Sequence, residues 1–175
     1  MFRNFRFISI FVFIILVPLN AIANEKIYFV DIDYILFNSI AGKKISIHIQ
    51  NENKKINSEL KEYNNSINKK KGELINQKNV LSKDEFNKKY LLLEEEIKKL
   101  NDIIKKKNLD LNNYKKNSRN EFLKKLEVIL HEYAKDKSIQ MILQKRNILL
   151  AKKELDVTKD VIELFNKNFK VIEVK

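Results

Sequence analysis

Few side chains in this sequence could act as acids, bases or metal ligands. Only His48 and His131 have side chains that ordinarily change charge near neutral pH, and the chain contains no cysteine. The two histidines fall in different predicted helices, and a lone helical histidine is more often solvated or packed than catalytic. No spacing of histidine and cysteine suits zinc. The sequence therefore predicts no catalytic, metal or cofactor site and does not point to an enzyme.

The residues around Gly42 do not form a phosphate-binding loop. Gly42 and Lys43 match the end of such a loop, but Lys44 occupies the position of its Ser or Thr. Phe37 stands where the first glycine of the motif is required. The sequence therefore gives no indication of an ATP-driven activity.

Lysine is the most prominent charged residue. The chain carries 35 Lys and Arg against 23 Asp and Glu, a net charge of +12. Such an excess attracts acidic lipid surfaces, acidic proteins or nucleic acid, although the clusters lack the interleaved aromatic residues of a nucleic-acid binder. Two interpretations of the lysine clusters stay open. They are solvated helix faces whose lysines reflect A/T-rich codons, or they create a positive field that binds anionic partners. The lysines predicted to bind such a partner are Lys69, Lys70, Lys71, Lys88, Lys89, Lys98, Lys99, Lys105, Lys106 and Lys107.

These lysines lie on two long segments with helical spacing. Apolar residues recur at steps of three and four between residues 49 and 74, and again between 86 and 114. This spacing predicts helices over about 42–80 and 83–136, each with the narrow apolar stripe of a coiled-coil seam. Between them, Ser82 and Glu85 form a capping box that begins the second helix. The sequence thus predicts an antiparallel hairpin with its tip near residues 81–85.

Polar residues interrupt the predicted seam at Lys70, Gln77, Lys107 and Ser118. One interpretation is that they fix the register or orientation of the two helices. The other is that they leave the arms under-packed, so that the arms can flex around a partner. The sequence leaves both interpretations open.

Short apolar runs flank the hairpin. Residues 26–32, 139–144 and 147–151 predict three strands, with a hairpin turn at 145–147. Strands this short are expected to form one small sheet at the root of the hairpin. A last helix, capped by Asp156 or Thr158, should follow.

A thin hairpin and one small sheet bury little apolar surface, which predicts that the chain oligomerises. The residues expected in the body that holds the copies together are Ile27, Phe29, Val30, Ile139, Met141, Leu143, Ile148 and Leu150.

The N-terminus reads as a secretory signal peptide. Arg3 and Arg6 precede a short apolar run that Pro18 ends, and cleavage is expected after Ala23. The predicted division is a signal peptide at 1–23, a body at 24–41 and 134–168, an arm at 42–133 and a tail at 169–175. Mobility is expected from Lys167 onward.

The flanks of the hairpin resemble the Skp/OmpH family of periplasmic chaperones. The similarity covers about residues 25–166, and it is carried by 26–31 and 38–43 before the arms and by 133–143 and 156–166 after them. Ser138 departs from the family, which usually has Gly at this helix end. The chain beyond Asn168 is longer than the family requires.

The resemblance implies a mostly helical α+β protein in which a long antiparallel coiled-coil hairpin projects from a small β-sheet body that trimerises. It implies a periplasmic holdase that works without ATP or another cofactor and binds unfolded outer-membrane proteins between basic arms. Contact with an anionic membrane surface is a further expected interaction, and nucleic acid is not an expected partner. The alternative function is a secreted coiled-coil spacer or adaptor at the cell envelope.

Overall fold

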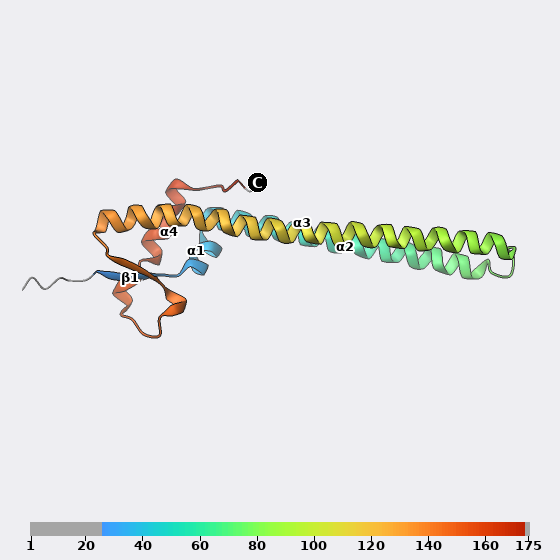
Figure 1. Ribbon diagram of the computed structural model, residues 1–175, viewed down its shortest axis with the longest axis horizontal. Coiled ribbons are helices and arrows are strands. Elements are labelled where there is room, and N and C mark those ends of the chain that lie inside the picture. Colours follow the sequence, from blue (N-terminus) through green and yellow to red (C-terminus); the bar gives the residue numbers. More distant parts are fainter. Residues whose placement is uncertain (1–25, 174–175) are drawn as a thin grey trace, which may run out of the picture.

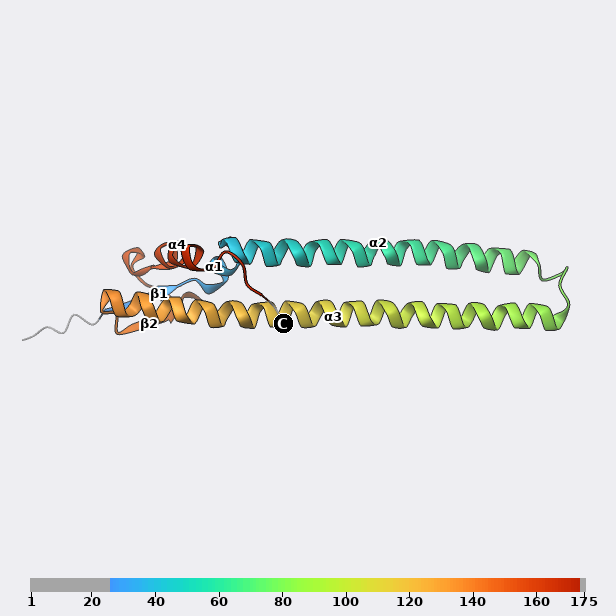
Figure 2. The ribbon, with the colours of Figure 1, turned by 90° about the horizontal axis from the view of Figure 1, so that it is seen from above.

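The structure is a computed structural model that describes residues 26–173, and the predicted signal peptide lies outside them. A long hairpin of two antiparallel helices projects from a small body that holds the other elements (Figures 1 and 2). Within the described residues, no helix is both long and apolar enough to cross a bilayer. The elements in chain order are β1 (Ile27–Val30), α1 (Ile32–Asn38), α2 (Ile40–Asn76), α3 (Lys83–Lys137), β2 (Met141–Gln144), 3-10 turns at Lys145–Asn147 and Lys153–Leu155, and α4 (Thr158–Asn168).

The predicted hairpin is confirmed, with small differences at its ends. α2 begins two residues before the predicted start, because the Ser39 side chain caps it by accepting a hydrogen bond from the Gly42 N–H at 3.1 Å. The helix ends at Asn76, four residues earlier than predicted. The capping box that starts α3 is confirmed, since the Glu85 N–H donates to Ser82 Oγ at 3.3 Å and the Ser82 N–H donates to Glu85 Oε2 at 3.1 Å.

α3 ends in a left-handed residue. Ser138 has φ 52° and ψ 45°, and the following Ile139 N–H donates to the Ala134 carbonyl at 2.8 Å. This bond and the one from the Ser138 N–H to the Lys135 carbonyl at 3.2 Å form a Schellman motif, which favours glycine at the left-handed position. The structure therefore explains why glycine is usual at this position, and Ser138 adopts the same left-handed backbone.

The small sheet has two strands, not the three expected. β1 pairs with β2 in parallel, with Ile27 opposite Met141 and Val30 opposite Gln144. The other edge of β1 meets the chain at Asp156, where the Val157 N–H donates to the Phe29 carbonyl at 3.0 Å. Residues 145–155 must therefore cross from one edge of β1 to the other.

The strand predicted at 147–151 is consequently wrong for the single chain, and so is the hairpin turn before it. Among the described residues β2 pairs with β1, and 147–151 form no ladder along it. Residues 145–147 instead form a 3-10 turn, and Ile148 and Leu150 lie in irregular backbone beyond it.

Most of the buried apolar surface lies in the body. Phe122 of α3 packs on Phe165 of α4 with ring centroids 4.6 Å apart, and both rings are fully buried. The core around them also includes Val30, Ile35, Ala41, Ile45, Leu126, Ile129, Tyr133, Val157, Val161 and Ile172. Because one core contains residues from both ends of the chain, the body can form only after the hairpin has folded back.

Part of the tail expected from Lys167 onward is packed in the structure. Lys167 and Asn168 are the last residues of α4, and Ile172 is buried in the body core. An isoleucine placed this close to the root can bury its side chain instead of leaving it in water, which is worth roughly 1.5–3 kcal/mol.

Along the arm, packing is uneven. Ile67, Leu74 and Leu93 form a second core near the tip, with Phe86, Ile97 and Leu100 packed against it. Between the two cores, Ile56 and Leu111 are buried without belonging to either cluster. The thinnest packing therefore lies in the middle of the arm.

Ser118 is the polar seam residue with the least favourable surroundings. Its side chain is fully buried at the root of the hairpin, and its hydroxyl has no hydrogen-bond partner among the described residues. A buried hydroxyl without a partner costs about 1–3 kcal/mol.

We expect Ser118→Ala to stabilise the protein by about 1 kcal/mol, because alanine fills nearly the same space and also favours the helix. Urea unfolding measures the change, with the exposed Ser58→Ala in α2 as the control. A lower unfolding midpoint for Ser118→Ala would show that the hydroxyl has a stabilising partner.

Tyr133 ties α3 to α4 through its hydroxyl, which donates to Asp160 Oδ2 at 2.8 Å. Burial, together with this hydrogen bond to a carboxylate, raises the pKa of Tyr133 to about 12. A folded-state pKa above the unfolded value of about 10 gives stability that is complete below pH 10 and is lost as the pH rises toward 12.

We therefore expect the free energy of unfolding of the wild type to fall between pH 10 and 12 more steeply than that of Tyr133→Phe, by about 2 kcal/mol in total. Urea unfolding at several pH values measures the difference. Tyr34 is exposed, so the control variant Tyr34→Phe should show the same dependence of unfolding free energy on pH as the wild type. Parallel profiles for wild type and Tyr133→Phe would contradict the assignment.

Candidate functional site

The ten predicted lysines all lie on the arm, in the distal part of α2 and along α3. Lys107 is half-buried and the others are exposed. Five of them contact a polar side chain: Lys69, Lys70, Lys89, Lys99 and Lys107. The predicted set is therefore divided between lysines that contact their own arm and lysines that do not.

Three of these contacts join α2 to α3. Lys70 Nζ lies 2.5 Å from Glu96 Oε1, and Lys89 Nζ donates to Gln77 Oε1 at 2.7 Å. Lys107 pairs with Glu59, and this hydrogen bond raises the pKa of Lys107. Partly exposed ion pairs contribute little stability, but they do select which residues lie opposite one another. These contacts support the interpretation that Lys70, Gln77 and Lys107 set the register of the hairpin.

The remaining five lysines form what we call the free lysine set. Within residues 26–173 they make no ion pair or side-chain hydrogen bond. Over residues 69–107, twelve lysines accompany seven acidic residues, so the distal part of the arm is positive. Such a surface attracts anionic molecules over roughly the Debye length, about 10 Å at 0.1 M salt. The free lysine set is Lys71, Lys88, Lys98, Lys105 and Lys106.

Apolar side chains are exposed beside these lysines. Ile75 and Val80 lie near the tip, while Leu91, Leu92 and Leu109 are on α3. None of them is needed for the hairpin seam, since each is more than half exposed. The arm therefore offers dispersed apolar contacts within a positive surface.

The residues predicted for the body fall into three groups. Phe29 and Val30 are buried inside the single chain, so they stabilise its own core. Ile139 and Ile148 are half-buried. Those with exposed side chains are Ile27, Met141, Leu143 and Leu150.

Leu149 was not among the predicted residues, yet it is fully exposed beside Leu150. Two adjacent leucines in water are unfavourable for a lone chain, and they mark a surface that a partner can cover. Residues 148–151 are all apolar, so the sequence pattern alone cannot show which of these side chains face inward. It pointed to Leu149 as strongly as to Leu150.

The two histidines do not come together. His48 packs against Tyr114 across the hairpin, with tilted rings whose centroids lie 4.5 Å apart. His131 Nδ1 lies 3.1 Å from the Glu127 carbonyl one turn earlier in α3. Among residues 26–173, no three metal-ligating side chains gather into a group.

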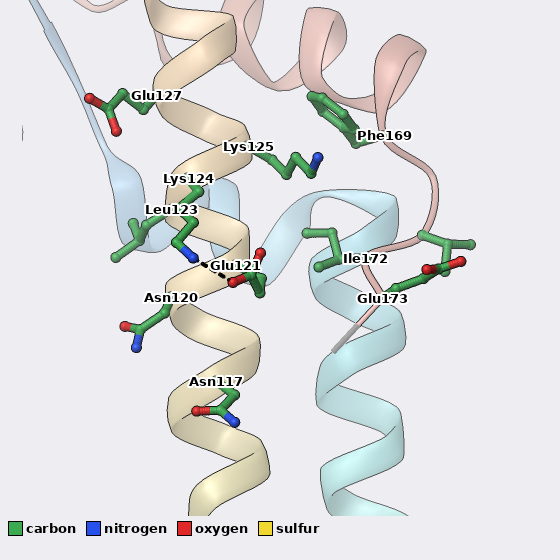
Figure 3. A pocket seen from close by; sticks show the side chains of 11 residues that line it. Asn117, Asn120, Glu121, Leu123, Lys124, Lys125, Glu127, Phe169, Ile172 and Glu173 are labelled. Carbon is green, nitrogen blue, oxygen red and sulfur yellow. Dashed lines mark hydrogen bonds and ion pairs between the residues drawn. The ribbon is translucent and has the colours of Figure 1, made fainter. Parts of the chain in front are cut away.

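A groove runs beside the root of α3, between residues 117–127 and the chain at 169–173 (Figure 3). Lys124 and Glu121 form an ion pair at 2.7 Å on one side of it. Lys125 Nζ lies 5.3 Å from the centre of the Phe169 ring, a cation–π contact. The groove has a volume of about 1030 Å³, and its lining mixes amides, charges and a few apolar side chains.

Two residues that position the arm could not be found from the sequence pattern. Asn166 Oδ1 in α4 accepts a hydrogen bond from the Ile40 N–H at 2.8 Å, so α4 caps α2. Gly42 is needed because a Cβ there would overlap the Leu36 carbonyl. Both depend on contacts between elements, which periodicity does not reveal.

Comparison with known proteins agrees with this architecture. A crystal structure of a Caulobacter crescentus CB15 protein, described as an OmpH-like outer membrane chaperone, has a TM-score of 0.79 to this structure. The two sequences are 12% identical, and the likeness covers 86% of this chain and 89% of the other, which shows a shared fold. No curated protein matches the chain. The model of one family, Outer membrane protein (OmpH-like), matches residues 26–165. Since that match covers the hairpin and both flanks, the chain belongs to the OmpH-like family.

Proposed function

We propose that this protein is a periplasmic chaperone that holds unfolded outer-membrane proteins without ATP. The observation that carries the proposal is the arm itself, a long hairpin on which free lysines and exposed apolar side chains are dispersed. Its OmpH-like family, and the chaperone description of a protein with the same fold, support the proposal.

Dispersed weak contacts suit an unfolded client. Many weak contacts on one surface hold a chain by their combined effect, while each can break singly when the client leaves. The free lysine set would attract an acidic client, and Leu91 and Leu92 would contact its apolar segments. An anionic membrane surface would meet the same lysines.

A homotrimer would place three such arms around a cavity. Support comes from the body, where Met141, Leu143, Leu149 and Leu150 are exposed and the outer edge of β2 has no strand beside it among the described residues. An open strand edge pairs readily with another chain. The segment 147–151 has strand composition but no strand partner within the described chain. We propose that it pairs with a neighbouring copy, which would make the third predicted strand a feature of the assembly.

The basic arms should control how quickly a client is captured. We expect the association rate for an acidic unfolded outer-membrane protein to fall about tenfold or more between 0.1 M and 1 M salt, as the Debye length shrinks from about 10 Å to about 3 Å. Stopped-flow fluorescence with a dye-labelled client measures this rate. An association rate that does not change with salt would point to purely apolar capture.

Charge-matched variants separate the arm from the overall net charge. Changing the free lysine set to glutamine should slow capture at low salt and flatten the salt dependence. The control changes five exposed lysines of the root and body to glutamine and removes the same charge. These are Lys43, Lys44, Lys152, Lys153 and Lys159. Equal slowing by both variants would contradict a specific role for the arm.

A rigid spacer at the cell envelope remains the second candidate, favoured by the cross-hairpin contacts and the packed core near the tip. A spacer would bind a folded partner and would not discriminate between folded and unfolded forms of one protein. A chaperone should bind only the unfolded form. Comparing capture of the same outer-membrane protein before and after refolding therefore distinguishes the two functions.

A further inference from the structure

The chain beyond α4 lies against the root of the hairpin. Residues 169–173 cross one face of the α2 and α3 pair near the place where the arm leaves the body (Figures 1 and 2). They follow the part of the chain that matches the OmpH-like family, which ends at residue 165. The segment is thus an addition to the matched region, located at the junction of arm and body.

Two of its side chains, those of Phe169 and Ile172, pack against the body. Ile172 is only 9% exposed and belongs to the core that contains Ala41 and Ile45 of α2 and Phe122 of α3. Phe169 packs on Phe165 of α4 with ring centroids 5.5 Å apart. Lys125 Nζ of α3 lies 5.3 Å from the centre of the same ring (Figure 3).

The residues between and after them face water. Val171 is 61% exposed, and Lys170 and Glu173 are also exposed. Inward side chains separated by outward ones are typical of a segment that packs along a surface, not of a disordered end. The segment therefore contacts α3 and α4 through Phe169, and it adds Ile172 to the core that α2, α3 and α4 share.

The position of these contacts matters because the arm is thinly packed just beyond them. Toward the tip, the next buried apolar side chains are Ile56 and Leu111, which belong to neither core. Local opening follows the density of buried contacts, so motion of the arm should begin in this thin region. Any contact that joins α2 to α3 at the root limits how far that motion extends into the body.

We propose that residues 169–173 form a C-terminal strap that joins α2 to α3 at the root of the hairpin and restricts opening there. The strap would keep the direction of the arm fixed relative to the body while the middle of the arm bends. Its consequence for client holding rests on the proposed function, but the strap itself is a property of the fold and can be tested without a client.

Hydrogen–deuterium exchange of the full chain tests the strap. The variant Phe169→Ala with Ile172→Ala should accelerate amide exchange about tenfold or more at residues 41–49 and 117–127, and should leave β1 and β2 within about twofold of wild type. Val171→Ala changes an exposed residue of the same segment and should exchange like wild type. Ile172→Val keeps a branched apolar side chain and should retain most of the wild-type protection. Unchanged exchange at the root would overturn the proposal.

A second outcome would also overturn it. If exchange rises equally in β1, β2 and the root, the two side chains are ordinary parts of the body core and not a strap. Client capture by the same variants is measured separately. If the exchange pattern is as expected but the wild type holds no client, the strap stands and the proposed function fails.

Discussion

Replacing Gly42 with alanine should destabilise the protein by about 3 kcal/mol, which lowers its melting temperature by roughly 10 °C. Gly42 lies in the first turn of α2, directly beneath the end of α1. A Cβ at this position would overlap the Leu36 carbonyl and lie 2.9 Å from Ser39 Oγ. Because the obstacle is backbone, α1 and α2 would have to move apart, and the cap on α2 would weaken.

The chain contains its own control for this substitution. Gly72 lies within α2 on the arm, and a Cβ there would have no neighbour within 4 Å. Gly72→Ala should therefore stabilise the helix by about 0.5–1 kcal/mol. Thermal unfolding followed by circular dichroism measures both variants. Equal melting temperatures for the two variants would show that the corner between α1 and α2 can adjust to a side chain.

Replacing Val30 with aspartate should unfold the body of each chain. Val30 is 2% exposed, in a core shared with Ile35, Phe122 and Val161. The variant loses the burial of an aliphatic side chain and places a charge without a partner there, a combined cost of about 4 kcal/mol or more. Loss of cooperative thermal unfolding would report the effect, and a variant as stable as wild type would contradict the packing of β1.

A paired substitution separates folding from association. Leu150 is 92% exposed, so Leu150→Asp should leave the single chain folded. If this surface joins copies into a trimer, the variant should be monomeric in light scattering while it keeps its helical circular dichroism. A wild-type protein that is already a stable monomer would contradict the proposed trimer.

The arm could be predicted from the sequence because its determinants are local. The apolar spacing in α2 and α3 and the capping box of Ser82 and Glu85 involve residues at most a few positions apart. The left-handed end at Ser138 was suggested by the family resemblance, because the family usually has glycine there. The polar seam positions Lys70, Gln77 and Lys107 were also located correctly, although only the structure shows their partners.

The body could be predicted only in outline, because its determinants are contacts between distant residues. Segment 147–151 has the composition of a strand, but composition cannot show that its own chain provides no strand to pair with. Ile172 lies in a basic stretch that resembles a tail, and its burial depends on the position of the hairpin root. Within the predicted site, the sequence could not separate lysines that bind their own arm from those that remain free.

The central claim is that the arms hold an unfolded outer-membrane protein, and suppression of aggregation tests it most directly. A urea-unfolded outer-membrane barrel protein is diluted into buffer with the purified full-length mature protein, and light scattering is followed without ATP. We predict that scattering falls in proportion to the amount of protein added and is suppressed near one assembly per client. The variant with the free lysine set changed to glutamine should suppress it less. Scattering that is the same with and without the wild-type protein, at low and high salt, would contradict the account.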